Sequence, residues 1–225
     1  MGFQRARTAE QRDIRRRAIL DTAAVMLDEM PVADLSLNDL ARRVGLAKSN
    51  VLRYFESREE ILLELLDQGF RRWLAELADE LPSMTDPGQP VIERIDRLAA
   101  VLSGSLQDHT VLCDLVSAQA GVLEHNVSVE VVVRYKRSTL ANLANLAAQV
   151  RGVVPELGDN AWSICLMGVA LAGGLYAHAR PAASTVAAYD ADPDLAALRI
   201  DARAAFARTL ATLMTGALYR SGGLN

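Results

Sequence analysis

The sequence predicts an all-α protein in which a small three-helix domain precedes a larger helical domain. Hydrophobic residues make up 51% of the 225 positions, and Ala and Leu dominate, which favours a packed helical core. Apolar residues recur at helical spacing along most of the chain. The best candidate for a strand, EVVVRY at residues 130–135, lies within such a helical pattern, so we expect it to be helical. The expected domain division is residues 1–57 and residues 58–225.

The first domain is predicted from three helical segments separated by turn signals. Residues 10–29 form one helix, which Pro31 ends, with an inward stripe of Ile14, Ala18, Ile19, Ala23 and Leu27. Ser36 is a good N-cap for a second helix over residues 37–44, in which Leu40, Ala41 and Val44 face inward. Gly45 provides the permissive backbone that a tight turn needs. A third helix is predicted over residues 47–54, with Val51 and Phe55 facing the core.

The second domain is predicted to begin with a long helix. SREE at residues 57–60 is a capping box, in which Ser57 caps the helix and Glu60 reaches back three residues to the backbone of Ser57. This helix covers residues 58–81, about 36 Å, and Pro82 closes it, so it can act as a lever. Further helices are predicted over residues 91–107, 110–121, 126–151, 159–179 and 194–219. Asp159 and Asp194 are the predicted caps of the last two. Residues 82–90 and 180–193 are predicted loops, and residues 221–225 a frayed tail.

One predicted helix requires a membrane test. Residues 160–179 carry no formal charge, and 20 helical residues reach about 30 Å, the thickness of a bilayer core. The segment contains Asn160, Ser163 and His178 and is rich in Gly and Ala, which favours a helix buried in protein over a membrane span. No secretory signal is recognised near the first residues. We expect a cytoplasmic protein with no membrane partner.

The N-terminal part has the features of a DNA-binding unit. Residues 1–58 hold 11 Lys+Arg and 8 Asp+Glu, whereas the remainder holds 13 and 20. Three helices with a Gly-containing turn are the helix-turn-helix arrangement, whose recognition helix enters the major groove. Outward amide and cationic groups fit base edges, and further cations, including the basic stretch at 5–17, fit phosphates. The predicted DNA contacts are Ser36, Asn38, Arg42, Arg43, Lys48, Ser49, Asn50, Arg53, Tyr54 and Arg58. The alternative for such residues is an ordinary solvated polar face.

LSLNDLARRVGLAKSNVLRYFESREEILLEL, residues 35–65, resembles the helix-turn-helix of the tetracycline-repressor (TetR) family of transcriptional regulators, and AILDTAA at 18–24 resembles its first helix. Three departures from the family pattern matter. Ala47 replaces the usual Ser cap, which removes a contact of about 1 kcal/mol. Leu52 replaces a Tyr that commonly touches phosphate, and Asn50 replaces a Thr. Asn reads bases more strongly than Thr, so Asn50 is among the predicted specificity residues.

The resemblance implies a repressor that binds a pseudo-palindromic operator as a homodimer, through its last two long helices, and is released by a small molecule. Small residues at helical spacing support the pairing, because they let helices approach closely; core positions within one chain are the alternative. The predicted interface comprises Gly168, Ala172, Leu175, Tyr176, Ala204, Ala207, Ala211 and Thr215. Apolar walls with a few polar groups suit a mostly apolar effector. The predicted lining, each member of which could also be plain core, comprises Leu102, Leu106, Cys113, Val116, Tyr135, Thr139, Asn142, Trp162, Cys165 and Leu166.

The sequence offers little for other classes of function. It contains no P-loop, GxSxG or HExxH motif, so we predict no catalytic site and no enzyme. A helical hydrolase or cyclase would need a carboxylate cluster, and DADPD at 190–194 is interpreted as a loop with a cap. The spacings of His109, Cys113, His125, Cys165 and His178 carry no ligand signature, so neither metal nor cofactor is predicted. The remaining alternative is a helical dimeric interaction protein that does not bind DNA. The predicted partners are double-stranded operator DNA, a second copy of the chain and an unidentified small-molecule effector.

Overall fold

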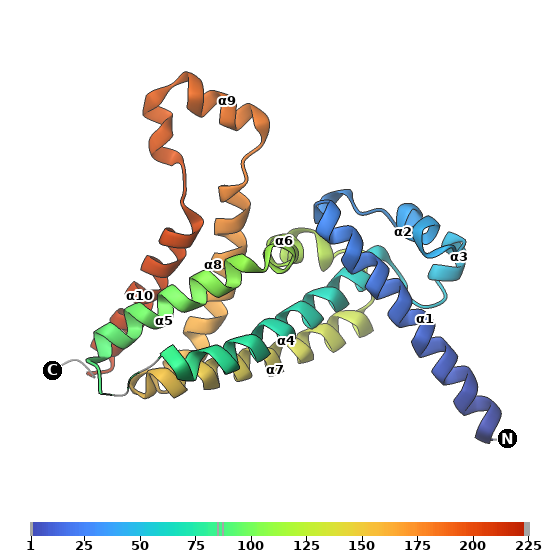
Figure 1. The fold of residues 1–225 in the computed structure, drawn as a ribbon, viewed down its shortest axis with the longest axis horizontal. Coiled ribbons are helices and arrows are strands. Elements are labelled where there is room, and N and C mark those ends of the chain that lie inside the picture. Colours follow the sequence, from blue (N-terminus) through green and yellow to red (C-terminus); the bar gives the residue numbers. More distant parts are fainter. Residues whose placement is uncertain (1, 85, 87, 223–225) are drawn as a thin grey trace.

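A computed structural model describes residues 2–84, 86 and 88–222, with the side chains of residues 2–9, 83 and 84 left out. The described part of the chain is built from helices joined by short connections and contains no strand (Figure 1), which confirms the predicted fold class. The EVVVRY segment is helical. Most of the tail at 221–225 and two positions of the 82–90 segment lie outside the described residues.

The N-terminal module consists of α1 (Gly2–Glu29), a 3-10 turn (Val32–Asp34), α2 (Leu37–Val44) and α3 (Lys48–Val51). Its core contains Ile19, Leu40, Val51 and Phe55, none more than 1% exposed. Ser36 accepts the backbone N–H of Asp39 at 3.1 Å, so the predicted N-cap is confirmed. Gly45 has a φ of 75°, in the left-handed region that glycine adopts without strain.

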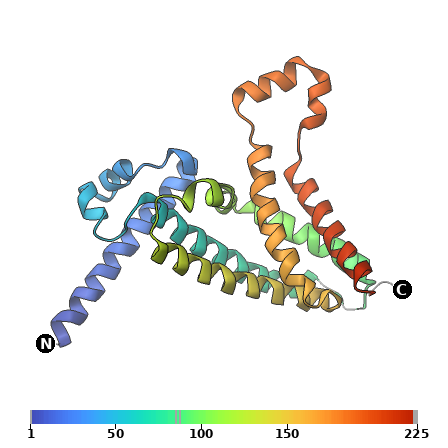
Figure 2. The same ribbon diagram turned by 180° about the vertical axis from the view of Figure 1, so that it is seen from behind.

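The module departs from the prediction at three points. The first helix begins at Gly2 rather than at residue 10. Ile14 is 56% exposed, because α1 at that point extends away from the other two helices (Figures 1 and 2). The third helix ends at Val51, and residues 52–54 continue as tighter turns, in which the N–H of Tyr54 donates to the carbonyl of Val51 at 2.9 Å. Ala47 supplies no side-chain cap, as its methyl group predicts.

The body comprises α4 (Arg58–Met84), α5 (Val91–Asp108), α6 (Thr110–Ala118), α7 (Val129–Val153), α8 (Asn160–Ala179) and α10 (Ala202–Arg220). A π-helical turn follows α6 at Gln119–Leu123, and a 3-10 turn joins α7 to α8 at Pro155–Leu157. α4 leaves the N-terminal module and lies alongside α7, while α8 packs against α6, α7 and α10 (Figures 1 and 2). One continuous core results, with Leu62, Leu77, Leu98 and Leu115 at most 1% exposed.

Several predicted helix ends are wrong. Pro82 lies inside α4, which continues to Met84, because a missing N–H in the last turn removes only one backbone hydrogen bond. α7 begins at Val129 with Ser128 as its cap, and Asp159 makes no side-chain capping bond because its own backbone is already helical. Ser57 does cap α4, accepting the N–H of Glu60 at 3.1 Å. The carboxylate of Glu60, however, accepts from Glu56 rather than from Ser57.

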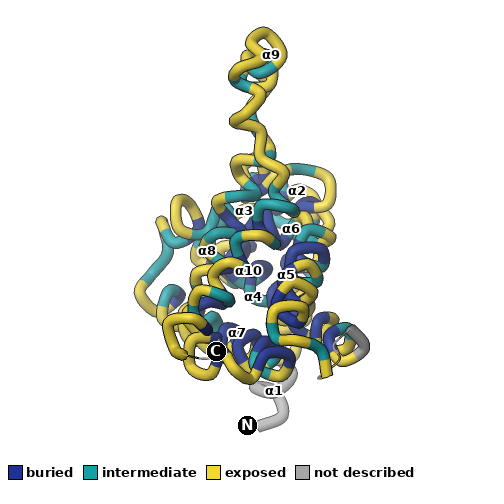
Figure 3. Tube along the Cα trace, turned by 90° about the vertical axis from the view of Figure 1, so that its left-hand side faces the viewer, coloured by how far each residue is buried: buried dark blue, intermediate teal, exposed yellow. Residues whose placement is uncertain are grey.

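An arm projects from the body between α8 and α10, over the loop predicted at residues 180–193 and the start of the helix predicted at residues 194–219. It contains α9 (Ala183–Ala191) and a 3-10 helix (Pro193–Leu198), and none of the residues of either helix is buried (Figure 3). Its helices follow from Ala-rich composition and capping by Asp192. Asp201, not Asp194, caps α10 by accepting the N–H of Ala204 at 3.0 Å.

α8 is the one helix among the described residues that is long and apolar enough to cross a membrane. Of its most apolar window, 28% is buried inside the protomer. Contacts within one chain therefore cover only part of this uncharged helix.

Candidate nucleic-acid interface and effector cavity

α3 presents a polar face to solvent. Val51 is fully buried on its inner side, whereas Lys48, Ser49, Asn50 and Arg53 are all exposed. The same four residues were predicted to face out, and their amide and cationic groups match the base edges of the major groove. Leu52, on this face, is 42% exposed and offers only an apolar contact.

α2 contributes two exposed arginines beside this face. Arg42 pairs with Asp39, and Arg43 makes a two-pronged contact with Glu29, with both pairs of atoms at 2.5 Å. The hydrogen bond from Arg43 lowers the pKa of Glu29. Exposed ion pairs contribute little to stability, so either arginine can exchange its carboxylate for a phosphate. Asn38, on the same helix, is exposed as well.

Two of the predicted DNA contacts, Ser36 and Arg58, have side chains that bond within the chain, and a third, Tyr54, does so only through its backbone. The guanidinium of Arg58 donates to the carbonyl of Val32 at 2.6 Å, which gives this side chain a structural role, and its contact with DNA stays a prediction. The hydroxyl of Ser36 is engaged in capping α2. Tyr54 is half-buried, and its carbonyl receives Arg16.

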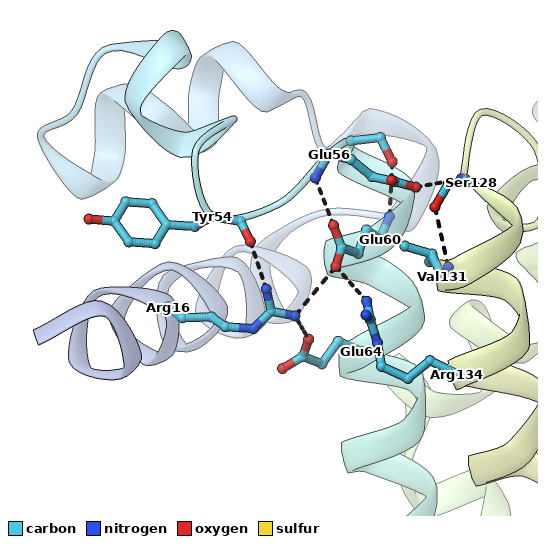
Figure 4. Close-up of polar contacts among 9 residues, drawn as sticks. Arg16, Tyr54, Glu56, Glu60, Glu64, Ser128, Val131 and Arg134 are labelled. Carbon is cyan, nitrogen blue, oxygen red and sulfur yellow. Dashed lines mark hydrogen bonds and ion pairs between the residues drawn. The ribbon is translucent and has the colours of Figure 1, made fainter. Parts of the chain in front are cut away.

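Arg16 lies in the basic stretch predicted to meet phosphates, but its role is different. Its guanidinium donates to the carbonyl of Tyr54 at 2.7 Å and pairs with Glu64 (Figure 4). It also lies 4.0 Å from the ring centre of Phe55. It therefore fastens the end of the recognition helix to α1 and α4. Sequence reasoning missed this clamp, for which the only signal was an arginine beside the core stripe of α1.

The body contains a cavity of about 500 Å³ between α4, α6, α7 and α8. Six predicted lining residues meet there: Val116, Tyr135, Thr139, Asn142, Trp162 and Leu166. Leu102, Leu106 and Cys165 instead line a separate apolar void of about 30 Å³ between α5, α8 and α10. Cys113 lines neither, because its thiol faces the carbonyl of Leu106 at 3.2 Å, so we correct its assignment. Because its volume is far larger than that of the void, the cavity is the candidate effector site.

The polar edge of the cavity is centred on Asp67 of α4, which sequence reasoning did not single out. Its carboxylate accepts from Asn142 at 2.9 Å and from Ser138, and it pairs with Arg71 at 2.7 Å. Burial raises the pKa of Tyr135, so its hydroxyl stays neutral near physiological pH. The only indication in the sequence was that two acidic residues, Glu64 and Asp67, interrupt the otherwise apolar run LLELLDQGF, residues 62–70.

The buried thiols offer no reactive group. Burial raises the pKa of Cys113 to about 11 and that of Cys165 to about 12, so both stay protonated near neutral pH. Among the described residues, no group of three His, Cys, Asp or Glu side chains could hold a metal. Asp190 of the predicted loop pairs with Arg199.

The small residues of α8 divide between two faces. Gly168 faces α10, where an added Cβ would lie 3.1 Å from Leu210, and Ala172 is 8% exposed. Both belong to the core of the protomer, and we correct their assignment to a dimer interface. The other predicted interface residues are all half-buried: Leu175, Tyr176, Ala204, Ala207, Ala211 and Thr215.

The outward face of α8 and α10 carries a different apolar set. Met167, Leu213 and Tyr219 are 52%, 39% and 75% exposed, and an added Cβ on Gly216 would meet no described atom within 4 Å. Packing within the protomer therefore does not require this glycine. An apolar face with small residues is the kind of surface on which helices of two chains can pack closely.

A helix-turn-helix module with an outward polar recognition face, joined to a helical body with a cavity, defines the class of one-component, ligand-responsive regulators. Residues 19–65 match the model for bacterial regulatory proteins of the tetR family, and residues 67–221 match the tetracyclin repressor-like C-terminal domain. The chain belongs to the tetracycline-repressor family, which confirms the family predicted from residues 35–65. Membership places it among transcription regulators rather than enzymes, as predicted.

Relatives and solved structures agree with this placement. The chain is 45% identical over 56 residues to the HTH-type transcriptional regulator EthR of Mycobacterium tuberculosis, covering 25% of this chain and 26% of EthR. It is 31% identical over 104 residues to the HTH-type transcriptional repressor KstR2 of the same species, covering 46% and 50%. These matches span only about a quarter to a half of the relatives' length.

The fold extends further than the sequence similarity. A possible TetR family regulator from Streptomyces coelicolor A3(2) superposes with a TM-score of 0.58 at 21% identity, covering 92% of this chain and 98% of that one. A TetR regulator from Rhodococcus sp. RHA1 gives 0.55 at 13% identity, covering 90% and 96%. At such identities the likeness establishes the fold alone.

Proposed function

We propose that this protein is a transcriptional repressor that binds a pseudo-palindromic operator as a homodimer and releases it on binding a small, mostly apolar effector. In this proposal residues 1–57 bind DNA and residues 58–225 bind the effector and dimerise, in the cytoplasm. The observation that carries it is the exposed polar face of α3, held outward by the buried Val51 and Phe55. Selection of bound duplexes from a random pool tests it, and a pool with no enriched site would favour the interaction protein that does not bind DNA.

Asn50 is expected to read a base, and the arginines of α2 to bind phosphates. Asn50→Ala should relax preference at one position of each half-site, at a cost of about 1–3 kcal/mol, because a paired amide contact is lost. Arg42→Ala and Arg43→Ala should weaken all sequences alike and flatten the salt dependence. Repeating the duplex selection with Asn50→Ala measures the first effect, and titrating a selected duplex at several salt concentrations with the arginine variants measures the second. An unchanged enriched site for Asn50→Ala would contradict the base-reading role.

The cavity favours an uncharged effector. Its walls are mostly apolar, and the cationic Lys136 in its lining is already paired with Glu124 at 2.5 Å. Burial alone would raise the pKa of Glu124, but hydrogen bonds from Lys136 and Gln119 lower it, which keeps the carboxylate charged. Asp67 stands at the polar edge with its own charge. An anionic head group would therefore meet a carboxylate without a free cation, and burying an unpaired charge is costly.

Matched alkyl probes test this charge preference. We expect 1-dodecanol to raise the unfolding temperature and dodecanoate to have little effect at the same free concentration, because stabilisation follows affinity for the native state. Asp67→Asn should reduce the difference between the two probes, whereas Asp79→Asn, farther along α4, should leave it unchanged. Equal stabilisation by alcohol and carboxylate in the wild-type protein would contradict an uncharged effector.

A further inference from the structure

The junction between the DNA-binding module and the body is held by glutamates of α4 and the segment before it. Glu60 is only 7% exposed and accepts the N–H of Glu56 at 2.7 Å, the guanidinium of Arg134 at 2.6 Å and that of Arg16 at 3.5 Å (Figure 4). Glu56 in turn accepts the N–H of Ser128 at 2.5 Å. The N-terminal end of α7 is thus attached to this junction at two places, to Glu56 before α4 and to Glu60 in its first turn.

We propose that Arg134 and Glu60 are positioning residues that carry occupancy of the cavity from α7 to the recognition helix; this rests on the proposed repressor function. In this arrangement movement of α7, in addition to movement of α4, carries the effect of effector binding to the DNA-binding module. Arg134 touches neither DNA nor effector. Its role is to hold Glu60, and through Glu60 to set the position of Arg16.

The geometry of α7 places both ends of this connection on one helix. Arg134, Ser138 and Asn142 are spaced four residues apart and therefore share one face, which contacts Glu60 and Asp67 of α4. Tyr135 and Thr139, adjacent to this face, line the cavity. An effector that fills the cavity must press against the same turns of α7 that hold Glu60.

Displacing α7 changes which arginine compensates the charge of the buried Glu60 carboxylate. Arg134 makes the shorter contact with Glu60, and Arg16 the longer one. If Arg134 withdraws, Glu60 is left with one cation partner, and closer approach of Arg16 compensates its charge. That movement draws Arg16 away from the carbonyl of Tyr54, the contact that fastens the recognition helix. The two arrangements differ in the orientation of α3, which two-fold operator binding requires to be fixed.

A cavity-filling substitution replaces the unidentified effector in the test. Thr139→Trp fills the cavity from α7, and Leu166→Trp fills it from α8, which covers a case in which one variant does not fold. Each is combined with Arg134→Gln or with Arg137→Gln, a matched change at an exposed arginine on the same helix. Operator affinity and amide hydrogen exchange of residues 54–60 are measured for every combination, and non-additivity gives the coupling. Wild-type protein with 1-dodecanol provides a third perturbation.

We expect each filler to weaken operator binding roughly 5- to 150-fold and to speed exchange at residues 54–60. In the Arg134→Gln background the filler should change operator affinity by no more than about twofold, whereas the Arg137→Gln background should keep the full effect. Equal behaviour of the two backgrounds, or unchanged exchange at residues 54–60 with every perturbation, overturns the proposal. Failure to select any operator contradicts the proposed function instead, and the exchange measurements still decide whether Arg134 couples the cavity to the module.

Discussion

Gly216→Glu is expected to convert the protein to monomers and to weaken operator binding at least about 100-fold, because linking two half-site contacts in one dimer multiplies affinity by 10²–10⁴. Gly216 lies in α10, and no described atom would contact a Cβ added there. In the proposed dimer the same position faces the partner, where two glutamates related by symmetry would be brought together and desolvated. Sedimentation and operator titration measure the two effects.

The effect of this substitution on stability has opposite signs for a dimer and for an isolated protomer, so it distinguishes the two. Gly inside a helix costs about 1 kcal/mol relative to Ala, and Glu is a good helix former, so in a protomer alone Gly216→Glu should stabilise α10. Ala144→Glu, at an exposed position of α7, is the matched control and should preserve assembly. A Gly216→Glu protein with a higher unfolding temperature and unchanged sedimentation would show that this face is not an interface.

The recognition helix was accessible to sequence reasoning because its pattern is local. Ser36, Gly45 and Phe55 define a cap, a turn and a core contact within 20 residues, and the outward positions follow from helical spacing. The face of α8 that meets a neighbour was not accessible in this way. Gly168 and Gly174 are both small residues in an uncharged helix, and only tertiary packing shows that Gly168 faces Leu210 and that Gly174 lines the cavity.

The same limit explains the missed arm and the missed junction. α9 buries no residue, so it lacks the apolar stripe from which a helix is recognised. Glu60 was identified as part of a local capping box, yet two of its partners lie 44 and 74 residues away in sequence. Contacts of that range depend on how α1 and α7 meet α4, which no single segment encodes.

Arg16→Gln is expected to lower the free energy of unfolding by about 1–3 kcal/mol and to weaken binding to every duplex, because charged hydrogen bonds to Tyr54 and Glu64 are lost. The side chain is 26% exposed, so water replaces part of the lost contact and the upper end of this range is a limit. Hydrogen exchange of residues 54–60 should rise, since Arg16 fastens the end of the recognition helix.

Arg17→Gln removes the same charge at the next position of α1, where the side chain is exposed. If Arg17 meets a phosphate, its loss should lower the salt dependence of operator binding by about 0.9 in the log–log slope and leave stability unchanged. Arg16 is paired with glutamates rather than phosphates, so Arg16→Gln should leave the slope unchanged while it weakens binding. A reduced slope with unchanged stability for Arg16→Gln would instead return Arg16 to the basic stretch that contacts the DNA backbone.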